Sequence, residues 1–184
     1  FLRVLDNFHD ELNYYIASEW ADGGSIHHLI KKKGSLKEHL VLWFMVNLIE
    51  SMAFSHSKGV IMGDFSSRNI FIKDSMIKIG ILDNSITISE VSKTNIPANG
   101  HSLSISPEVL RGQNLSFKAD LWSLGVVLFE MMYGTPPLLE TTLAKLKQSF
   151  ETFKFVNKET ESNPSRWLLS SLLEGLLVVD DSKR

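Results

Sequence analysis

Cysteine is absent from the 184-residue chain, and this absence excludes disulfides, thiolate catalysis and cysteine-based zinc sites. An excess of one charge is also lacking, because 19 Lys and Arg stand against 21 Asp and Glu. The formal net charge of −2 provides no basic field for nucleic acid or an anionic membrane surface. No uninterrupted apolar run approaches the roughly 20 residues of a membrane span. We therefore expect neither nucleic acid nor a membrane as a partner, and a cytoplasmic or nuclear location.

Several familiar catalytic patterns are missing as well. The sequence has no HExxH zinc motif, no G-x-S-x-G nucleophile elbow and no glycine-rich phosphate loop. His27 and His28 are adjacent, and on a helix their side chains point about 100° apart, so they cannot bind one metal ion together. We therefore expect no zinc site.

Hydrophobic patterning predicts an α+β domain. Two runs rich in β-branched, aromatic and Leu residues, 1–8 and 14–20, flank a polar turn and predict a β-hairpin. Ser25 is placed to cap a helix that ends at Leu29 or Ile30, with a solvated basic end after it. The other expected elements are a helix over 36–57, strands over 70–72 and 77–81, a long polar loop over 83–106, and helices over 117–133, 141–153 and 164–178. A hairpin followed by a mostly helical remainder is an α+β pattern.

Asp64 and Asn69 are the first candidate site residues. They lie five positions apart, just before the strand expected at 70–72. A carboxylate can orient a hydroxyl, and a carboxamide can supply an oxygen ligand to a metal–phosphate site. Taken alone, the two side chains are more typical of turn caps, so the surrounding motifs must decide between these interpretations.

Five segments, in order and suitably spaced, together resemble the eukaryotic protein-kinase domain over essentially the whole chain. They are YIASEWADGGS at 15–25, HSKGVIMGDFSSRNI at 56–70, SPEVL at 106–110, KADLWSLGVVLFEM at 118–131 with GTPP at 134–137, and VDDSKR at 179–184. The resemblance implies a protein-kinase-like fold. Residues 1–22 would be a remnant of the small lobe, with its fourth and fifth strands and the hinge. Residues 23–184 would be the mostly helical large lobe, incomplete at its C-terminal end, and the sequence would be a piece of a longer protein.

The resemblance also implies a nucleotide site at the hinge. Glu19 and Ala21 would offer backbone groups to an adenine edge, and Ser18 would guard the pocket behind them. Phe71 and Ile26 would form the floor, where the family commonly has Leu in place of Phe71. The larger ring would either stack on a base or fill its space, and ordinary strand packing is an equally good interpretation.

The catalytic and architectural roles follow from the same resemblance. Asp64 would be the catalytic base and Asn69 a magnesium ligand. Arg68 could return part of the positive charge that is lost because Ser66 replaces a Lys. An active domain would use ATP and Mg²⁺ as cofactors.

Three further positions would maintain the scaffold. Asp120 would accept hydrogen bonds from the catalytic-loop backbone, and Glu108 would form a buried ion pair with Arg184. These three roles predict that the kinase-like scaffold is preserved. They carry no information about whether the domain catalyses phosphate transfer.

Departures from the family pattern favour weak or absent catalysis. Ile81 stands where the D-F-G motif has its magnesium-binding Asp, and a hydrocarbon cannot stabilise transferring phosphate through a metal. Gly63 stands where the family has an Arg that binds the phosphorylated activation loop. We therefore expect that phosphorylation of the activation loop does not activate this domain through that contact. Asp83 would become a metal ligand if its strand slid by two residues, since a strand repeats its facing every two residues.

The sequence thus favours a pseudokinase that binds a protein partner or regulates an attached domain, with weak or no nucleotide binding. The alternative is a divergent active serine/threonine kinase that transfers the γ-phosphate of ATP to protein. A third, weaker interpretation is a truncated fragment without independent function.

Overall fold

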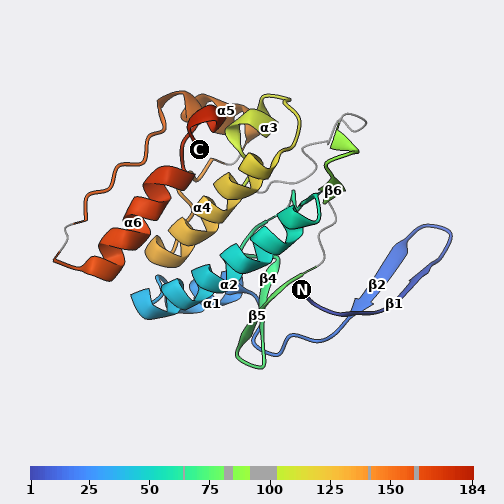
Figure 1. Ribbon diagram of the computed structural model, residues 1–184. Coiled ribbons are helices and arrows are strands. Elements are labelled where there is room, and N and C mark those ends of the chain that lie inside the picture. The colour runs from blue at the N-terminus through green and yellow to red at the C-terminus, as the bar shows by residue number, and fades with distance from the viewer. Residues whose placement is uncertain (64, 81–84, 92–102, 141, 160–161) are drawn as a thin grey trace.

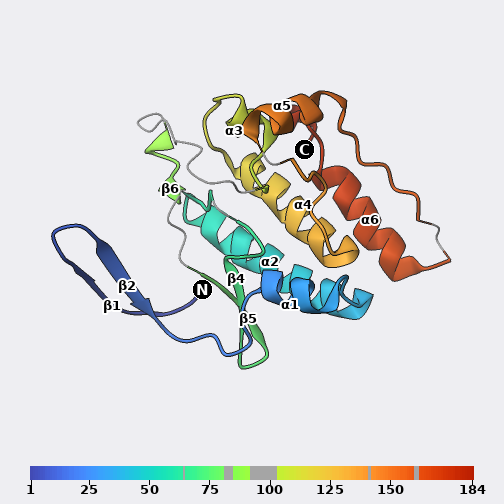
Figure 2. The ribbon, with the colours of Figure 1, turned by 180° about the vertical axis from the view of Figure 1, so that it is seen from behind.

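The computed structural model describes residues 1–63, 65–80, 85–91, 103–140, 142–159 and 162–184. A helical body carries a β-hairpin that projects from one side, in both the front and the rear view (Figures 1 and 2). The elements in chain order are β1 (Val4–His9), β2 (Tyr14–Ser18), α1 (Ile26–Lys33), α2 (Glu38–Ser57), β3 (Val60–Ile61), β4 (Ile70–Lys73), β5 (Met76–Ile79), β6 (Ile86–Thr87), α3 (Pro107–Leu110), α4 (Phe117–Tyr133), α5 (Leu143–Thr152), α6 (Pro164–Leu176) and the 3₁₀ helix η2 (Asp181–Lys183). The expected α+β class is confirmed.

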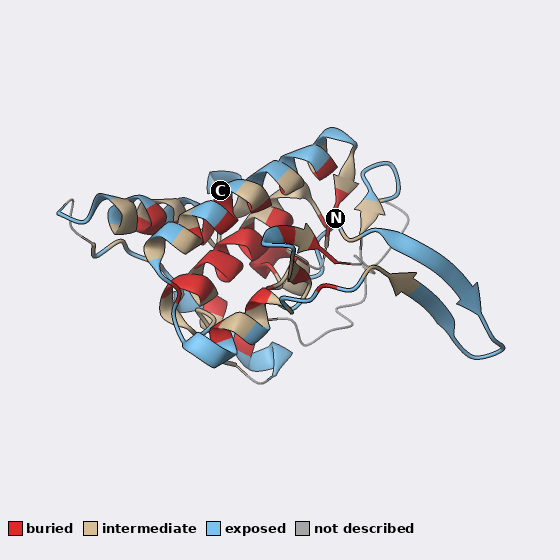
Figure 3. Cartoon of the chain, turned by 90° about the horizontal axis from the view of Figure 1, so that it is seen from below, coloured by how far each residue is buried: buried red, intermediate tan, exposed pale blue. Residues whose placement is uncertain are grey.

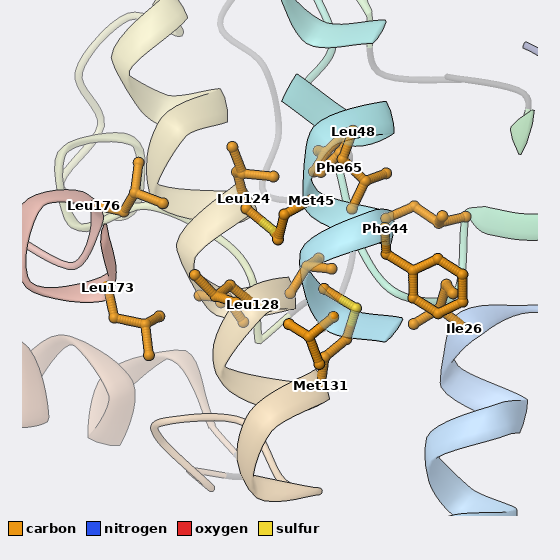
Figure 4. Packing of buried hydrophobic residues seen from close by; sticks show 14 of the residues in the cluster. Ile26, Phe44, Met45, Leu48, Phe65, Leu124, Leu128, Met131, Leu173 and Leu176 are labelled. Atoms are coloured by element: carbon orange, nitrogen blue, oxygen red, sulfur yellow. The ribbon is translucent and has the colours of Figure 1, made fainter. Parts of the chain in front are cut away.

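Helix α4 forms the centre of the core. It packs against α6, α2 and α1, and Figure 4 shows Leu124, Leu128 and Met131 directed between these helices. Leu128 and Met131 have no exposed surface. A helix that is apolar around most of its circumference is stable only when neighbouring elements cover it, which explains its central position.

Helix α2 is long and apolar enough to cross a membrane by length and composition alone. Its buried side chains include Phe44, Met45 and Leu48. In Figure 4 Met45 lies toward α4, and Phe44 lies beside Ile26 of α1. The core helix of a globular domain has the same composition, and the packing of α2 against α4, β3 and α6 accounts for its apolar character.

The β4–β5 hairpin is regular and two-sided. Its antiparallel register pairs Ile70 with Ile79 and Phe71 with Lys78 without a bulge. The turn is made by Asp74 and Ser75, both in the left-handed region with φ of 49° and 61°, as a two-residue hairpin turn requires. Because side chains alternate, one face of this hairpin enters the core. The other face carries Lys73 and Lys78, which lie near Glu19 of residues 19–23, the hinge segment that follows β2.

The β1–β2 hairpin is exposed on both faces. Every residue of β1 is exposed, and only the end of β2 is partly buried, as the pale blue hairpin in Figure 3 shows. Two strands alone do not enclose a core. The stability of the described part of the chain therefore resides in the helical body.

Several element boundaries differ from those expected. Helix α1 is capped by Ser25, whose hydroxyl accepts the His28 N–H, but it extends one turn further, to Lys33. The long polar loop expected over 83–106 contains a short strand, β6, which pairs with β3. Neither two-residue strand has a periodic signature, since each forms only through pairing between segments distant in sequence.

Candidate functional site

The loop expected to carry catalysis begins at β3 and is held by α4. Asp120 accepts the backbone N–H of Met62 at 2.8 Å and that of Gly63 at 3.0 Å. His56 Nε2 lies 2.8 Å from the same carboxylate, and a carboxylate only accepts hydrogen bonds, so this contact requires a proton on Nε2. The Asp120 side chain is 1% exposed. The arrangement fastens the start of the loop to the most buried helix, as the motif predicted.

Glu108 and Arg184 form a buried, two-pronged ion pair. Arg184 donates from Nη1 to Oε1 at 2.7 Å and from Nη2 to Oε2 at 3.1 Å. The Arg184 and Glu108 side chains are 0% and 4% exposed. Arg184 also donates to the carbonyls of Lys118 and Val178 and lies over the Trp122 ring, 5.2 Å from its centroid. Such complete pairing is what allows two charges to be buried together.

A cavity of about 580 Å³ lies beside the loop. Ser66, Arg68 and Asn69 line it on one side, and Glu130 lines it from α4. Burial raises the pKa of the Glu130 carboxyl, while a hydrogen bond from Ser67 and the charge of Arg68 oppose this shift. The cavity therefore combines an exposed cation with a poorly solvated carboxyl next to the residues expected to act in catalysis.

The hinge segment is fastened to the β4–β5 hairpin by backbone and charge. Gly23 N–H donates to the Ile72 carbonyl at 2.9 Å, and the Glu19 carboxylate lies 3.7 Å from Lys73 Nζ and 3.9 Å from Lys78 Nζ. A hydrogen bond from the Arg3 backbone N–H lowers the pKa of Glu19, and the two lysines add to this effect. The carboxylate of Glu19 thus joins the hinge to the strand beneath it.

The remaining expected hinge residues lie around this segment. Ser18 ends β2 and is partly buried, and the Ala21 carbonyl accepts the Gly24 N–H at 3.2 Å. Phe71 and Lys73 are on the same face of β4, and Lys73 contacts Glu19, so Phe71 faces the hinge side. Ile26 has no exposed surface and belongs to the core, so it can support the floor but cannot itself present surface to a ligand.

Three positions that decide the expected chemical step lie outside the described residues. Asp64, Ile81 and Asp83 all fall in the excluded positions, so the roles assigned to them stay predictions. Asn69 is described, and its carbonyl accepts the Gly80 N–H at 2.7 Å. Within the described ranges, no group of three or more His, Asp or Glu side chains is arranged to hold a metal ion.

Two residues of this region had no role in the sequence analysis. His56 reaches Asp120 across 64 positions, and Glu130 enters the cavity from the last turn of α4. Both lie inside segments that resemble the kinase domain, 56–70 and 118–131, but the resemblance was not used to assign a role to either side chain. Their partners are set by how α2, α4 and the loop pack, which periodicity cannot reveal.

Comparisons with known proteins point in one direction. Residues 1–184 match the family model of the protein kinase domain. The serine/threonine-protein kinase PKH3 of Eremothecium gossypii is 28% identical over 192 residues, covering 100% of this chain and 26% of that protein. The cell cycle serine/threonine-protein kinase CDC5/MSD2 of Saccharomyces cerevisiae is 29% identical over 177 residues, covering 94% of this chain and 25% of that protein. The serine/threonine-protein kinase PKH2 of Saccharomyces cerevisiae is 31% identical over 153 residues, 76% of this chain and 14% of that protein. The chain thus spans about a quarter or less of the length of these relatives.

Proposed function

Because the chain belongs to the protein kinase domain family, we propose that it acts as a pseudokinase. In this proposal the kinase architecture serves to bind a protein partner or to regulate an attached domain. Phosphate transfer is negligible, and nucleotide binding is weak or independent of magnesium. The location would be cytoplasmic or nuclear.

The register of the β4–β5 hairpin is the observation that carries the proposal. Ile70 pairs with Ile79, and Gly80 donates its N–H to the carbonyl of Asn69. The hairpin has no bulge and a two-residue turn, so no extra residue has been drawn into the strand. Ile81 therefore follows directly in sequence after Gly80, which is hydrogen-bonded to Asn69. The register of the described strands gives no support for the two-residue slide that would bring Asp83 to the position of Ile81.

The described residues fit magnesium poorly. Mg²⁺ prefers carboxylate oxygens and phosphates in a near-octahedral set, and Asn69 offers only a carboxamide. The sequence places Ile81 where the family has its metal-binding Asp. Bound metal would neutralise charge on the transferring phosphate, and this chain supplies hydrocarbon at that position.

The proposal is tested by measuring γ-phosphate transfer to a mixed peptide library in four forms of the protein. These are the native protein, Asp64→Ala, Asp83→Ala and Ile81→Asp. We expect only background transfer in the first three forms. A loss of about 4 kcal/mol of transition-state stabilisation already lowers the rate about a thousandfold. Thermal shift with ATP should be small and unchanged by Mg²⁺ in the native protein.

The Ile81→Asp variant is the matched gain-of-function control. It restores a carboxylate at the family's metal position, so a magnesium-dependent ATP shift should appear in this variant alone. Robust transfer by the native protein that is abolished by both Asp64→Ala and Asp83→Ala would contradict the proposal.

A second candidate function is a divergent active serine/threonine kinase. It is favoured by the relatives, which are named as serine/threonine-protein kinases. The intact anchoring of the loop by Asp120 is equally compatible with it. In that case ATP and Mg²⁺ would be cofactors, and Asp83 would hold the metal.

A further inference from the structure

The strap, residues 153–159 in the connection between α5 and α6, is an extended segment with the alternation of a β-strand. It starts at Phe153, whose φ of −66° and ψ of 126° are extended. Residues 153, 155, 157 and 159 are partly buried, whereas residues 154, 156 and 158 are exposed. A period of two is that of a strand with one face on the protein and the other in solvent. Figures 1 and 2 both show this segment at the outer edge of the helical body.

Two aromatic side chains fix the first half of the strap to α4. The Phe153 ring lies 5.8 Å from the Trp122 ring, and the Phe155 ring lies 6.1 Å from the Phe129 ring, measured between centroids. Both contacts are edge-to-face, which is an arrangement that aromatic pairs prefer.

Two polar side chains fix the second half of the strap to α6. Asn157 Nδ2 donates to the Ser171 hydroxyl at 3.0 Å. Arg166 Nε donates to the Glu159 carboxylate at 2.8 Å. Because side chains hold the strap extended along its length, a second strand that bound to it would lose less conformational entropy than one that bound to a mobile loop.

The backbone of the strap has no strand partner in the described part of the chain. Residues 153–159 belong to no sheet, and the backbone groups of Lys154, Phe155, Val156 and Lys158 make no hydrogen bond to other described backbone groups. The strap also contains no Pro, so each of its residues carries an N–H donor. A row of unpaired N–H and carbonyl groups is a template to which another strand can add.

The solvent face of the strap carries two cations around an apolar residue. Lys154, Val156 and Lys158 point to the same side because they are two positions apart, and Val156 is 47% exposed. Neither lysine forms an ion pair within the described residues. An added strand would therefore place its own outward side chains beside two lysines without counter-charges.

The same charges disfavour pairing between two copies of the strap. In an antiparallel pair centred on Val156, Lys154 of one copy would lie opposite Lys158 of the other. Like charges directly opposite each other destabilise a pair of strands, and lysines at sheet edges prevent edge-to-edge association in this way. Charge complementarity thus favours an acidic segment of another protein over a second copy.

We propose that the strap is a strand-addition site for an extended segment of a protein partner, in which two acidic residues flank an apolar residue at alternate positions. Main-chain hydrogen bonds would supply affinity, and the acidic residues opposite Lys154 and Lys158 would supply specificity. The inference rests on the proposed function only in taking partner binding as a role of the domain. It identifies the chemistry of the partner at a surface that does not line the cavity beside the catalytic loop.

The probe is the synthetic peptide Thr-Glu-Thr-Val-Thr-Glu-Thr with blocked ends, whose symmetric pattern suits either strand direction. Binding to the isotope-labelled protein is measured by NMR titration, and amide hydrogen exchange locates the contact. We expect saturable binding at about 1 mM peptide or below. Amides of the strap should become protected at every second residue, because one edge of a strand bonds to its neighbour through alternate residues.

Charge reversal in the strap tests specificity. Lys154→Glu/Lys158→Glu should weaken binding of the acidic peptide by about tenfold or more, since two opposite-charge pairs become like-charge pairs. This variant should instead bind the matching peptide with Lys in place of both Glu residues. Lys145→Glu/Lys147→Glu is the control, because it reverses two exposed lysines of α5 and changes the net charge equally. It should alter the affinity by less than about twofold.

Four results would overturn the proposal. They are no binding of the acidic peptide at about 1 mM, binding without alternating protection in the strap, an equal loss of affinity in the α5 control, and self-association of the protein that protects the same amides. Absence of peptide binding would leave the pseudokinase assignment intact, because phosphate transfer tests that assignment. Phosphate transfer by the native protein would refute the assignment and leave the strap as a binding site.

Discussion

The helical body and the β1–β2 hairpin are comparably rich in apolar residues but use them in opposite ways. In the body, Leu128, Met131 and Leu173 have no exposed surface. In the hairpin, Leu5 and Phe8 are 57% and 54% exposed, and Figure 3 shows the hairpin in pale blue, turning tan only at its base. Apolar composition produces a core only where a second layer of structure covers it.

The polar contacts of the two regions also differ, in sequence separation and in burial. Those of the hairpin are local: Asp10 accepts backbone N–H groups of its own turn, chiefly that of Leu12, and its pKa is lowered as a result. Those of the body are long-range and buried, as between Glu108 and Arg184. Local contacts shape a hairpin, whereas buried long-range contacts make the stability of the body depend on its complete tertiary structure.

The largest expected effect comes from the buried ion pair. Glu108→Gln leaves the Arg184 guanidinium buried without its counter-charge, and removing one partner of such a pair costs roughly 3–5 kcal/mol. The urea midpoint of unfolding should fall accordingly. Asp180→Asn is the matched control, because its pair with Lys183 is exposed and should be worth less than about 1 kcal/mol. An unchanged midpoint in Glu108→Gln would refute the architectural role of this pair.

A direct comparison of the two regions comes from one substitution made in each. Leu128→Ala creates a cavity in the centre of the core and should lower the free energy of unfolding by about 2–5 kcal/mol. Leu5→Ala removes an exposed side chain and should change it by no more than about 0.5 kcal/mol. Urea unfolding of both variants measures the difference. A large cost for Leu5→Ala would mean that another part of the protein covers the hairpin.

The smallest expected effect concerns pH. Burial raises the pKa of Glu130 above its value in the unfolded chain, so the folded state binds more protons between the two values. Stability should therefore fall as pH rises through that window. Glu130→Gln should lose this slope and gain at most about 1 kcal/mol relative to the native protein near neutral pH. Urea midpoints measured from about pH 4 to about pH 8, a range that starts near the usual carboxyl pKa and extends above it, would reveal the slope. Identical slopes in both proteins would contradict the assignment.

The sequence by itself determined the architecture to a large extent. Apolar runs bounded by turn-forming residues located α2, α4 and the β4–β5 strands. Five ordered motifs predicted the kinase-like fold, and the family match over residues 1–184 confirms it. The motifs also anticipated the contacts of Asp120 and the pair of Glu108 with Arg184, since these residues act at fixed positions of the fold.

Only the tertiary structure decided how these residues meet. His56 reaches Asp120 and Glu130 enters the cavity because separate helices pack there. The strand pairing of β3 with β6 and the contact of Asn157 with Ser171 have the same origin. Local sequence encodes the period of an element, the caps of its ends and the residues of a motif. Contacts between distant segments depend on side-chain volume, register and the burial of charge, which come into being only when the elements pack against one another.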